Sequence, residues 1–345
     1  MGRDNMIIGF GNYLKDYLEL YNISQKEFAL RLGITPKHLN EIINKNIDMS
    51  DELIGAISSI TGIQADFIFG IEQQKKNKRY FLEKFHTEKN LKKYINNYEY
   101  KEIEKLNWVH FKNKNDTYQM ANDILNFIKF RNFDCLEDFR NHILFKRKET
   151  KDYYKLVLWL ARCDEISQKQ KVNEYSKDCF DKIIKFLEKE RMNPLNIEKL
   201  KEKFNNYGIY FVIEEALKGS KIRGSFKVKG KNPAIYLTKL YKDKASFYYA
   251  LYHELGHLKT DFNKGKNKVM IVEDDSQEKR ADEFAQNQMI PVLAWKNIQS
   301  NMDEKELLRI SKKNHIPMCF ITTRLAYLKI IEYNHPLYIK YKETI

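Results

Sequence analysis

The stretch FYYALYHELGHL at residues 247–258 decides the fold of the C-terminal half of the chain. Its apolar residues predict a buried helix, and His253 and His257 stand four residues apart, so both side chains project from one face. Two imidazoles on one helix face can bind the same metal ion, while Glu254 lies one step round the helix. This HExxH spacing is typical of a catalytic Zn²⁺ site, in which the Glu takes a proton from water. We therefore predict Zn²⁺ as cofactor and Glu254 as the catalytic residue.

A third protein ligand is expected, because catalytic zinc has three protein ligands and one open position. The stretch EKRADEFA at residues 278–285 predicts a second helix, on which Glu278 and Asp282 share a face. We predict Glu278 as the third ligand and Asp282 as the hydrogen-bond partner of a ligand histidine. Three acidic residues in a predicted loop just upstream are alternatives for the third ligand: Glu273, Asp274 and Asp275.

The stretch SQKEFALRLGITPKHLNEII at residues 24–43 predicts two short helices joined by a tight turn. Ser24 and Glu27 form a capping box at the start of the first helix, Gly33 ends it, and Thr35 caps the second. Apolar residues at helical spacing on both sides predict five helices in all. This arrangement is typical of a helix-turn-helix domain.

Residues 10–70 resemble the DNA-binding domains of the Xre and phage-repressor family. The resemblance implies that the helix beginning at Pro36 is the recognition helix. The candidate DNA-contacting residues are Gln25, Thr35, Lys37, His38, Asn40 and Glu41. The alternative is a domain that only contacts proteins, because residues 1–70 carry six basic and nine acidic residues, a net charge of −3. Phosphate binding then requires a local positive face.

The whole chain is basic, with 61 Lys and Arg against 47 Asp and Glu and a formal net charge of +14 over 345 residues. The surplus lies in the middle and C-terminal parts, so it does not support DNA binding by the N-terminal domain. It indicates either an acidic partner or a solvated Lys-rich surface. No apolar stretch is long enough to cross a bilayer, no secretory signal is visible, and the four cysteines lack metal-binding spacing. We expect a cytoplasmic protein without membrane contact.

Residues 197–330 resemble the ImmA/IrrE family of metallopeptidases. The resemblance rests on five ordered pieces: YGIYFV from residue 207, NPAIYL from residue 232, YHELGHL from residue 252, EKRADEFAQNQMIP from residue 278, and LLRISKKNHIPMCFITTRL from residue 307. It implies His253, His257 and Glu278 as zinc ligands and Glu254 as the catalytic residue. Many relatives carry a further His four residues after the last His of the motif, where this chain has Asp261.

The expected fold is mainly α with a small β-sheet (α+β). Residues 1–72 form a five-helix helix-turn-helix domain, and residues 73–170 a Lys-rich helical connector with a linker at 75–79. Residues 171–345 form a zincin-like metallopeptidase domain with a C-terminal helical subdomain. The closing residues 310–325 show a second helix-turn-helix-like spacing, for which the alternative is simple packing behind the active site.

The resemblance implies a zinc-dependent endopeptidase that cleaves a partner transcriptional repressor, itself a helix-turn-helix protein. The N-terminal domain would target the enzyme to double-stranded operator DNA or to the repressor, as a homodimer if it follows other helix-turn-helix domains. One alternative is a DNA-binding regulator whose zinc fold is a sensor or inactive. Another is an interaction or antitoxin-like module in which neither domain has its family's activity.

Two further expectations concern the substrate. An extended peptide is expected to pair with the strand near Ile235, as peptides commonly do at sheet edges. The oxyanion requires a donor, and Tyr249, Tyr252 and Lys259 are candidates between which the sequence does not choose.

Overall fold

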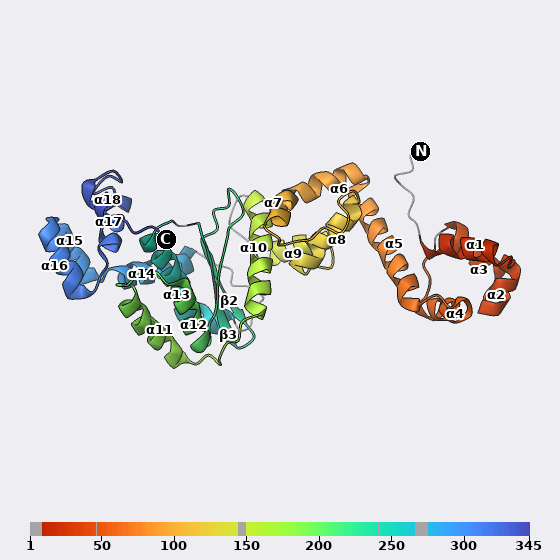
Figure 1. The fold of residues 1–345 in the computed structure, drawn as a ribbon, viewed down its shortest axis with the longest axis horizontal. Coiled ribbons are helices and arrows are strands. Elements are labelled where there is room, and N and C mark those ends of the chain that lie inside the picture. Colours follow the sequence, from red (N-terminus) through yellow and green to blue (C-terminus); the bar gives the residue numbers. More distant parts are fainter. Residues whose placement is uncertain (1–8, 46, 144–149, 241, 266–274) are drawn as a thin grey trace. The chain divides into compact units, whose positions relative to one another are not determined.

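The computed structural model describes residues 9–45, 47–143, 150–240, 242–265 and 275–345, and its elements are drawn in Figure 1. Two compact units are present, Met1–Asn126 and Phe127–Ile345, and each is described by itself. Helices dominate and are accompanied by a mixed three-stranded sheet, which confirms the predicted fold class. The three-part domain division stays a prediction. Among the described residues, no helix combines the length and the apolar character needed to cross a membrane.

The first unit begins with five helices around one apolar core. These are α1 (Phe10–Leu20), α2 (Gln25–Leu32), α3 (Pro36–Lys45), α4 (Asp51–Thr61) and α5 (Ala65–Phe85). The predicted caps are present: the Ser24 hydroxyl accepts from Glu27 N, and the Thr35 hydroxyl accepts from His38 N. Further along the chain lie α6 (Glu88–Ile95), the 3-10 helix η2 (Asn96–Tyr98), α7 (Tyr100–Lys105) and α8 (Thr117–Ile128), and the boundary between the two units falls near the end of α8.

The charged run at residues 75–79 differs from the predicted linker, because it lies inside α5. The Lys75 side chain is only 1% exposed and its Nζ lies 2.5 Å from Glu72 Oε2. Lys75 also donates to the carbonyl of Ile47 at 3.0 Å, and Glu72 accepts from Phe10 N at 2.9 Å. This buried ion pair therefore ties α5 both to the start of α1 and to the segment after α3.

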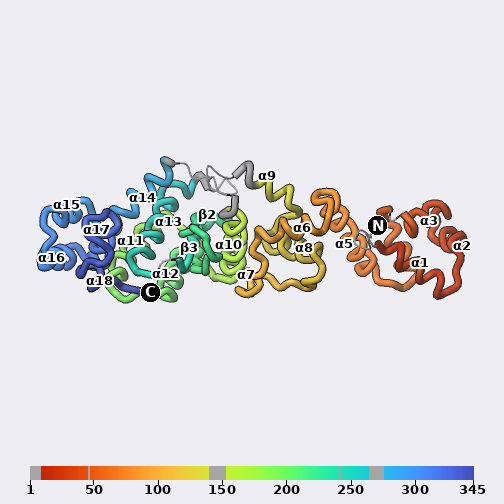
Figure 2. The backbone as a smooth tube through the Cα atoms, turned by 90° about the horizontal axis from the view of Figure 1, so that it is seen from above, coloured from red at the N-terminus to blue at the C-terminus, as the bar shows by residue number. Residues whose placement is uncertain are grey.

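The second unit contains the sheet and the HExxH helix. Its elements are α9 (Phe133–Ile143), α10 (Thr150–Gln168), α11 (Lys177–Glu190), α12 (Ile197–Asn206), β1 (Tyr210–Glu214), β2 (Gly224–Lys229), β3 (Asn232–Thr238), α13 (Lys244–Gly265), α14 (Asp275–Met289), α15 (Val292–Ser300), α16 (Glu304–Asn314), α17 (Met318–Tyr327) and α18 (Pro336–Tyr341). Figure 2 follows the same elements along the backbone trace.

The sheet has the order β1-β3-β2, with β1 parallel and β2 antiparallel to β3. Because side chains alternate along β3, Ile235 joins the core shared with α13, whereas Tyr236 faces α10 and donates to Asp164 at 2.7 Å. The sheet thus lies between α10 and α13 (Figure 1). Since β3 has a partner strand on both sides, the expectation that a substrate strand pairs near Ile235 is wrong.

The two outer strands differ in how their edges are covered. Phe211 in β1 is paired by the Gln170 side chain, which donates to its carbonyl at 2.7 Å and accepts from its N–H at 3.1 Å. A side-chain amide that mimics a neighbouring strand blocks strand addition at this edge. Within the described part of the chain, β2 is the outer strand next to α13 and carries no such amide.

The helix-turn-helix-like spacing near the C-terminus forms α16 and α17, but α17 is buried on most of its surface. Phe320, Ile321 and Leu325 are at most 1% exposed and belong to the core that contains α13. A helix enclosed in this way cannot enter a DNA groove. The interpretation as a second DNA-binding motif is therefore wrong, and the packing role is the one observed.

Replacement of Lys75 by Met should leave the Glu72 carboxylate buried without its cation. Loss of one partner of a buried ion pair costs about 3–5 kcal/mol in free energy of unfolding. Urea unfolding followed by circular dichroism measures the loss. Lys76→Met, at the exposed neighbouring position, is the matched control and should change little; equal stability of the two variants would contradict a structural role for the pair.

Candidate metal centre

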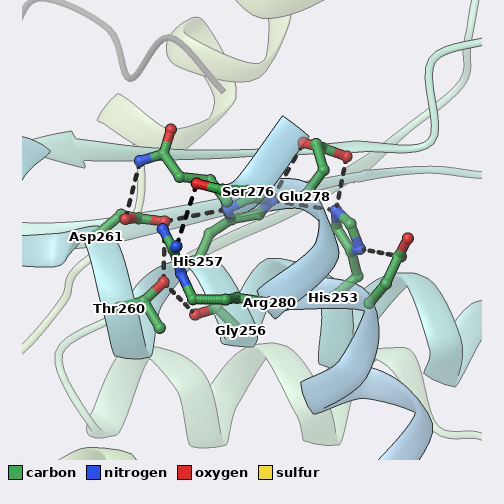
Figure 3. Close-up of polar contacts among 10 residues, drawn as sticks. His253, Gly256, His257, Thr260, Asp261, Ser276, Glu278 and Arg280 are labelled. Atoms are coloured by element: carbon green, nitrogen blue, oxygen red, sulfur yellow. Dashed lines mark hydrogen bonds and ion pairs between the residues drawn. The ribbon is translucent and has the colours of Figure 1, made fainter. Parts of the chain in front are cut away.

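The packing of α13 against α14 brings the predicted zinc residues together. The two helices run antiparallel, so Glu278 lies against both His253 and His257 (Figure 3). One turn further along α14, Asp282 lies against the other side of His253. Gly256 permits this approach, because a Cβ at that position would lie 2.8 Å from the Cα of Ala281 in α14. Any side chain at residue 256 would push the two helices apart.

Three potential ligand groups converge between the helices. The Nε2 atoms of His253 and His257 are 3.1 Å apart, and each lies 3.6 Å from an oxygen of Glu278. One ligand atom from each residue lies within 4.8 Å of the others, close enough to hold a single metal ion. The structure therefore assembles the three residues that the sequence predicts as ligands, while their role stays a prediction.

Carboxylates on the far side of each imidazole determine where the ring protons lie. The Nδ1 atom of His253 is 2.9 Å from Asp282 Oδ1, and that of His257 is 3.3 Å from Asp261 Oδ2. Because an ionised carboxylate only accepts, each Nδ1 carries the hydrogen and each Nε2 presents a lone pair. Burial, reinforced by the neighbouring His257, lowers the pKa of His253 and so favours its neutral form.

This donor set fits zinc. Two imidazole lone pairs and a carboxylate directed at one point repel each other unless a cation lies between them. Two nitrogens and one oxygen are the ligand set of many catalytic zinc sites. Two Zn–N bonds of about 2.0–2.1 Å at a tetrahedral angle separate the nitrogens by roughly 3.4 Å, close to the 3.1 Å between the two Nε2 atoms.

Glu254 is buried at 4% exposure on the same helix as the two histidines. Its carboxyl group packs against Gly224, the first residue of β2. The contact is so close that a Cβ at residue 224 would lie 2.4 Å from Glu254 Oε1. The predicted catalytic carboxylate thus stands between the HExxH helix and the outer strand of the sheet. A side chain at residue 224 would force this carboxyl group to shift.

Asp261 is the functional candidate that the sequence reasoning missed. It is fully buried, and its carboxylate accepts from Gln277 at 2.9 Å and from Thr260 at 2.9 Å in addition to the contact with His257. Burial alone would raise the pKa of Asp261, but these hydrogen bonds outweigh it and lower that pKa. Its position four residues after His257, on the same helix face, was the available signal.

The alternatives for ligand and oxyanion donor have different outcomes. Glu273 and Asp274 lie outside the described residues, and Asp275 is the first residue of α14. The Tyr249 hydroxyl donates to Asp282 at 2.8 Å, and Lys259 Nζ lies 5.1 Å from the centre of the Phe284 ring. Tyr252 is fully buried in the core beside Arg191. None of the three proposed oxyanion donors is thereby singled out.

The candidate DNA-contacting residues lie on α2 and α3 in the first unit. Asn40 donates to Gln25 at 3.5 Å, so the start of α2 and the middle of α3 share one face. Lys37 and Asn40 are exposed on it, and His38 is half-buried. The structure thus places these side chains together without testing their contacts.

Comparison with known families identifies only part of the first unit. Residues 14–68 match a family model described as helix-turn-helix. This part of the chain is an Xre-type helix-turn-helix domain. The match supports a DNA-binding regulatory role. No curated protein matches the chain.

Ion pairs within the helix-turn-helix domain occupy two of its cations. Glu41 on α3 forms an ion pair with Lys45 at 3.2 Å, and Glu27 pairs with Arg31 on α2. Thr35 is exposed, but its hydroxyl already caps α3. The cations available to phosphates on this face are therefore few, and Lys37 is the exposed one nearest the start of α3.

Replacement of Asp261 by Asn should weaken zinc binding by about 10- to 100-fold. Both oxygens of the Asp261 carboxylate accept hydrogen bonds, whereas an Asn side chain has one oxygen and one NH₂ group. The NH₂ group of Asn would therefore face a donor, either that of Gln277 or those of Thr260 and His257. Competition with a chromogenic chelator measures the affinity. Glu283→Gln, at an exposed position of α14, is the control and should bind zinc like the wild type; an equal affinity of Asp261→Asn would exclude Asp261 as a support of His257.

Proposed function

We propose that this protein is a zinc-dependent endopeptidase that cleaves a partner transcriptional repressor. The observation that supports the proposal is the convergence of His253, His257 and Glu278 on one point, with each imidazole oriented by its own carboxylate. The resemblance of residues 197–330 to regulatory metallopeptidases supplies the substrate class. A helix-turn-helix repressor is the proposed substrate.

The chain's own residues divide the catalytic work among them. When bound, Zn²⁺ polarises the scissile carbonyl and lowers the pKa of water. The Glu254 carboxylate accepts a proton from the attacking water and passes it to the leaving amine. Asp282 and Asp261 keep the imidazoles in the tautomer that presents Nε2 to the ion. The burial of Glu254 against β2 keeps its carboxylate in one place.

The outer strand β2 is the proposed docking edge for the substrate backbone. Thr238 N donates to Arg223 O at 3.0 Å, so the backbone polar groups of Arg223 point toward β3. In an antiparallel pair these groups alternate in direction, so the backbone N–H and C=O of the next residue, Gly224, point away from β3. A peptide added at this edge forms main-chain hydrogen bonds beginning at Gly224, beside Glu254. This replaces the strand near Ile235 as the proposed docking site.

The helix-turn-helix domain serves targeting in this proposal. It directs the peptidase either to operator DNA or to the repressor bound there, and a homodimer would match a palindromic operator. A second candidate function is a DNA-binding regulator whose zinc fold is a sensor or inactive. The family match of residues 14–68 favours this second candidate, because that match alone supports a DNA-binding role.

Replacement of Glu254 by Gln separates the two candidates. The peptidase proposal expects full zinc content and a loss of cleavage of about 10²–10⁴-fold, because the amide cannot accept the proton. Metal analysis is paired with incubation against helix-turn-helix repressors from the same genomic neighbourhood and mass spectrometry of fragments. Undiminished cleavage by the variant would refute the mechanism. Operator binding by the wild type without any cleavage would favour the regulator.

Replacement of Gly224 by Ala should displace Glu254 while leaving the zinc ligands in place. The added methyl overlaps the carboxyl group, and a misplacement of about 1 Å costs roughly 100-fold in rate. We expect kcat to fall while zinc affinity and the thermal midpoint stay near wild type. Gly55→Ala, within α4, is the control, because the backbone there is helical and no atom lies within 4 Å of the added Cβ. A fully active Gly224→Ala enzyme would refute the close packing proposed for the general base.

A further inference from the structure

Polar side chains between α13 and α14 form a row that includes the metal ligands and extends beyond them. His253 and Tyr249 share one carboxylate oxygen of Asp282, at 2.9 and 2.8 Å. One helical turn further along α14, Gln286 lies 3.5 Å from Arg324 Nη2 in α17. The row therefore leads from the candidate metal centre to a cation on a neighbouring helix.

The two ends of this row differ in exposure. At one end, Asp261 is fully buried and His257 is 1% exposed. Towards the other end, the Asp282 side chain is 47% exposed, and Tyr327, near Tyr249 and one turn after Arg324, is 75% exposed. A large substrate can therefore reach the row from the Asp282 side and not from the Asp261 side.

Arg324 is a half-buried cation without an acidic partner among the residues that the structure describes. Its guanidinium lies over the Trp295 ring, with Cζ 4.2 Å from the ring centre, and its polar contact is the neutral Gln286. Burial lowers the pKa of Arg324 without a carboxylate to oppose it. A guanidinium carries five N–H donors, so most of its hydrogen-bonding capacity is left for a ligand.

The chemistry of this cation selects its ligand. A planar guanidinium held against an aromatic ring is preorganised for a carboxylate, which it binds through two parallel hydrogen bonds. The surrounding part of the chain is also basic, since residues 171–345 carry 33 basic and 23 acidic residues. Such a surface attracts an acidic protein segment.

We propose that Arg324, supported by Trp295, forms a subsite for an acidic side chain of the protein substrate. The inference rests on the proposed peptidase function and adds a preference to it. Asp282 and Tyr249 lie between the metal centre and this subsite. The acidic residue of the substrate, an Asp or a Glu, therefore occupies a fixed position some residues away from the cleaved bond.

A peptide library tests the subsite in the full-length zinc-loaded protein. The peptides are acetylated and C-terminally amidated, so that every carboxylate is a side chain, and fragments are identified by mass spectrometry. We expect Asp or Glu to be enriched at one position relative to the cleaved bond, and Arg324→Gln to abolish this enrichment. For the best acidic peptide, KM should rise by about 10- to 100-fold with kcat little changed.

Arg324→Gln and Arg324→Glu distinguish recognition of an acidic substrate residue from a purely structural role, in which Arg324 would only hold α17 against α15. A clamp would affect all peptides alike, whereas the subsite requires that a peptide with Gln in place of the acidic residue be cleaved equally by wild type and Arg324→Gln. Arg324→Glu should shift the preference to Lys or Arg at the same position. Arg309→Gln, at a 62% exposed side chain of α16, is the control and should retain the acidic preference.

The outcomes separate this inference from the function on which it rests. An active wild type without acidic enrichment would overturn the subsite and leave the peptidase intact. A preference seen only in a library with free C-termini would likewise overturn it, because the ligand would then be the terminal carboxylate. No cleavage of any peptide or repressor by the wild type would refute the peptidase itself and the subsite with it.

Discussion

The close antiparallel contact between α13 and α14 is the constraint on which the candidate site depends. Gly256 lets the backbones approach at Ala281, and this approach places His257 beside Glu278 and His253 beside Asp282. A helix alone can align two histidines, but it cannot supply a third ligand of suitable geometry from its own face. The second helix supplies that ligand and one of the two orienting carboxylates.

Polar groups are costly to bury, and the second unit compensates for them by pairing. Asp261, fully buried, accepts hydrogen bonds at both oxygens, and the two imidazoles each have an acceptor at Nδ1. The two Nε2 lone pairs face each other at 3.1 Å and repel. A cation between them would complete the arrangement, which is why the geometry itself favours a metal. The first unit shows the same principle in the Lys75–Glu72 pair, where each buried charge has the other as its partner.

Much of the local structure was predictable, because it depends on short-range spacing. The caps at Ser24 and Thr35 and the helix that carries HELGH each follow from residues within a few positions of one another. The features that were missed depend on contacts far apart in the sequence. The sequence pattern indicated that Lys75 was a solvated linker residue. Its Nζ instead donates to the carbonyl of Ile47, which follows another helix and is distant in the sequence. The central position of β3 was hidden because strand order is a property of the whole sheet.

The sequence by itself determined which residues share a helix face: His253 with His257, Glu278 with Asp282, and the candidate reading residues of α3. Helical periodicity is local, so spacing alone carries this information. Only the tertiary structure decided that Gln277 in α14 donates to the Asp261 carboxylate, that Glu254 packs against Gly224, and that the Arg324 guanidinium lies over the Trp295 ring. Each of these contacts joins separate elements, and their approach is set by how the cores pack.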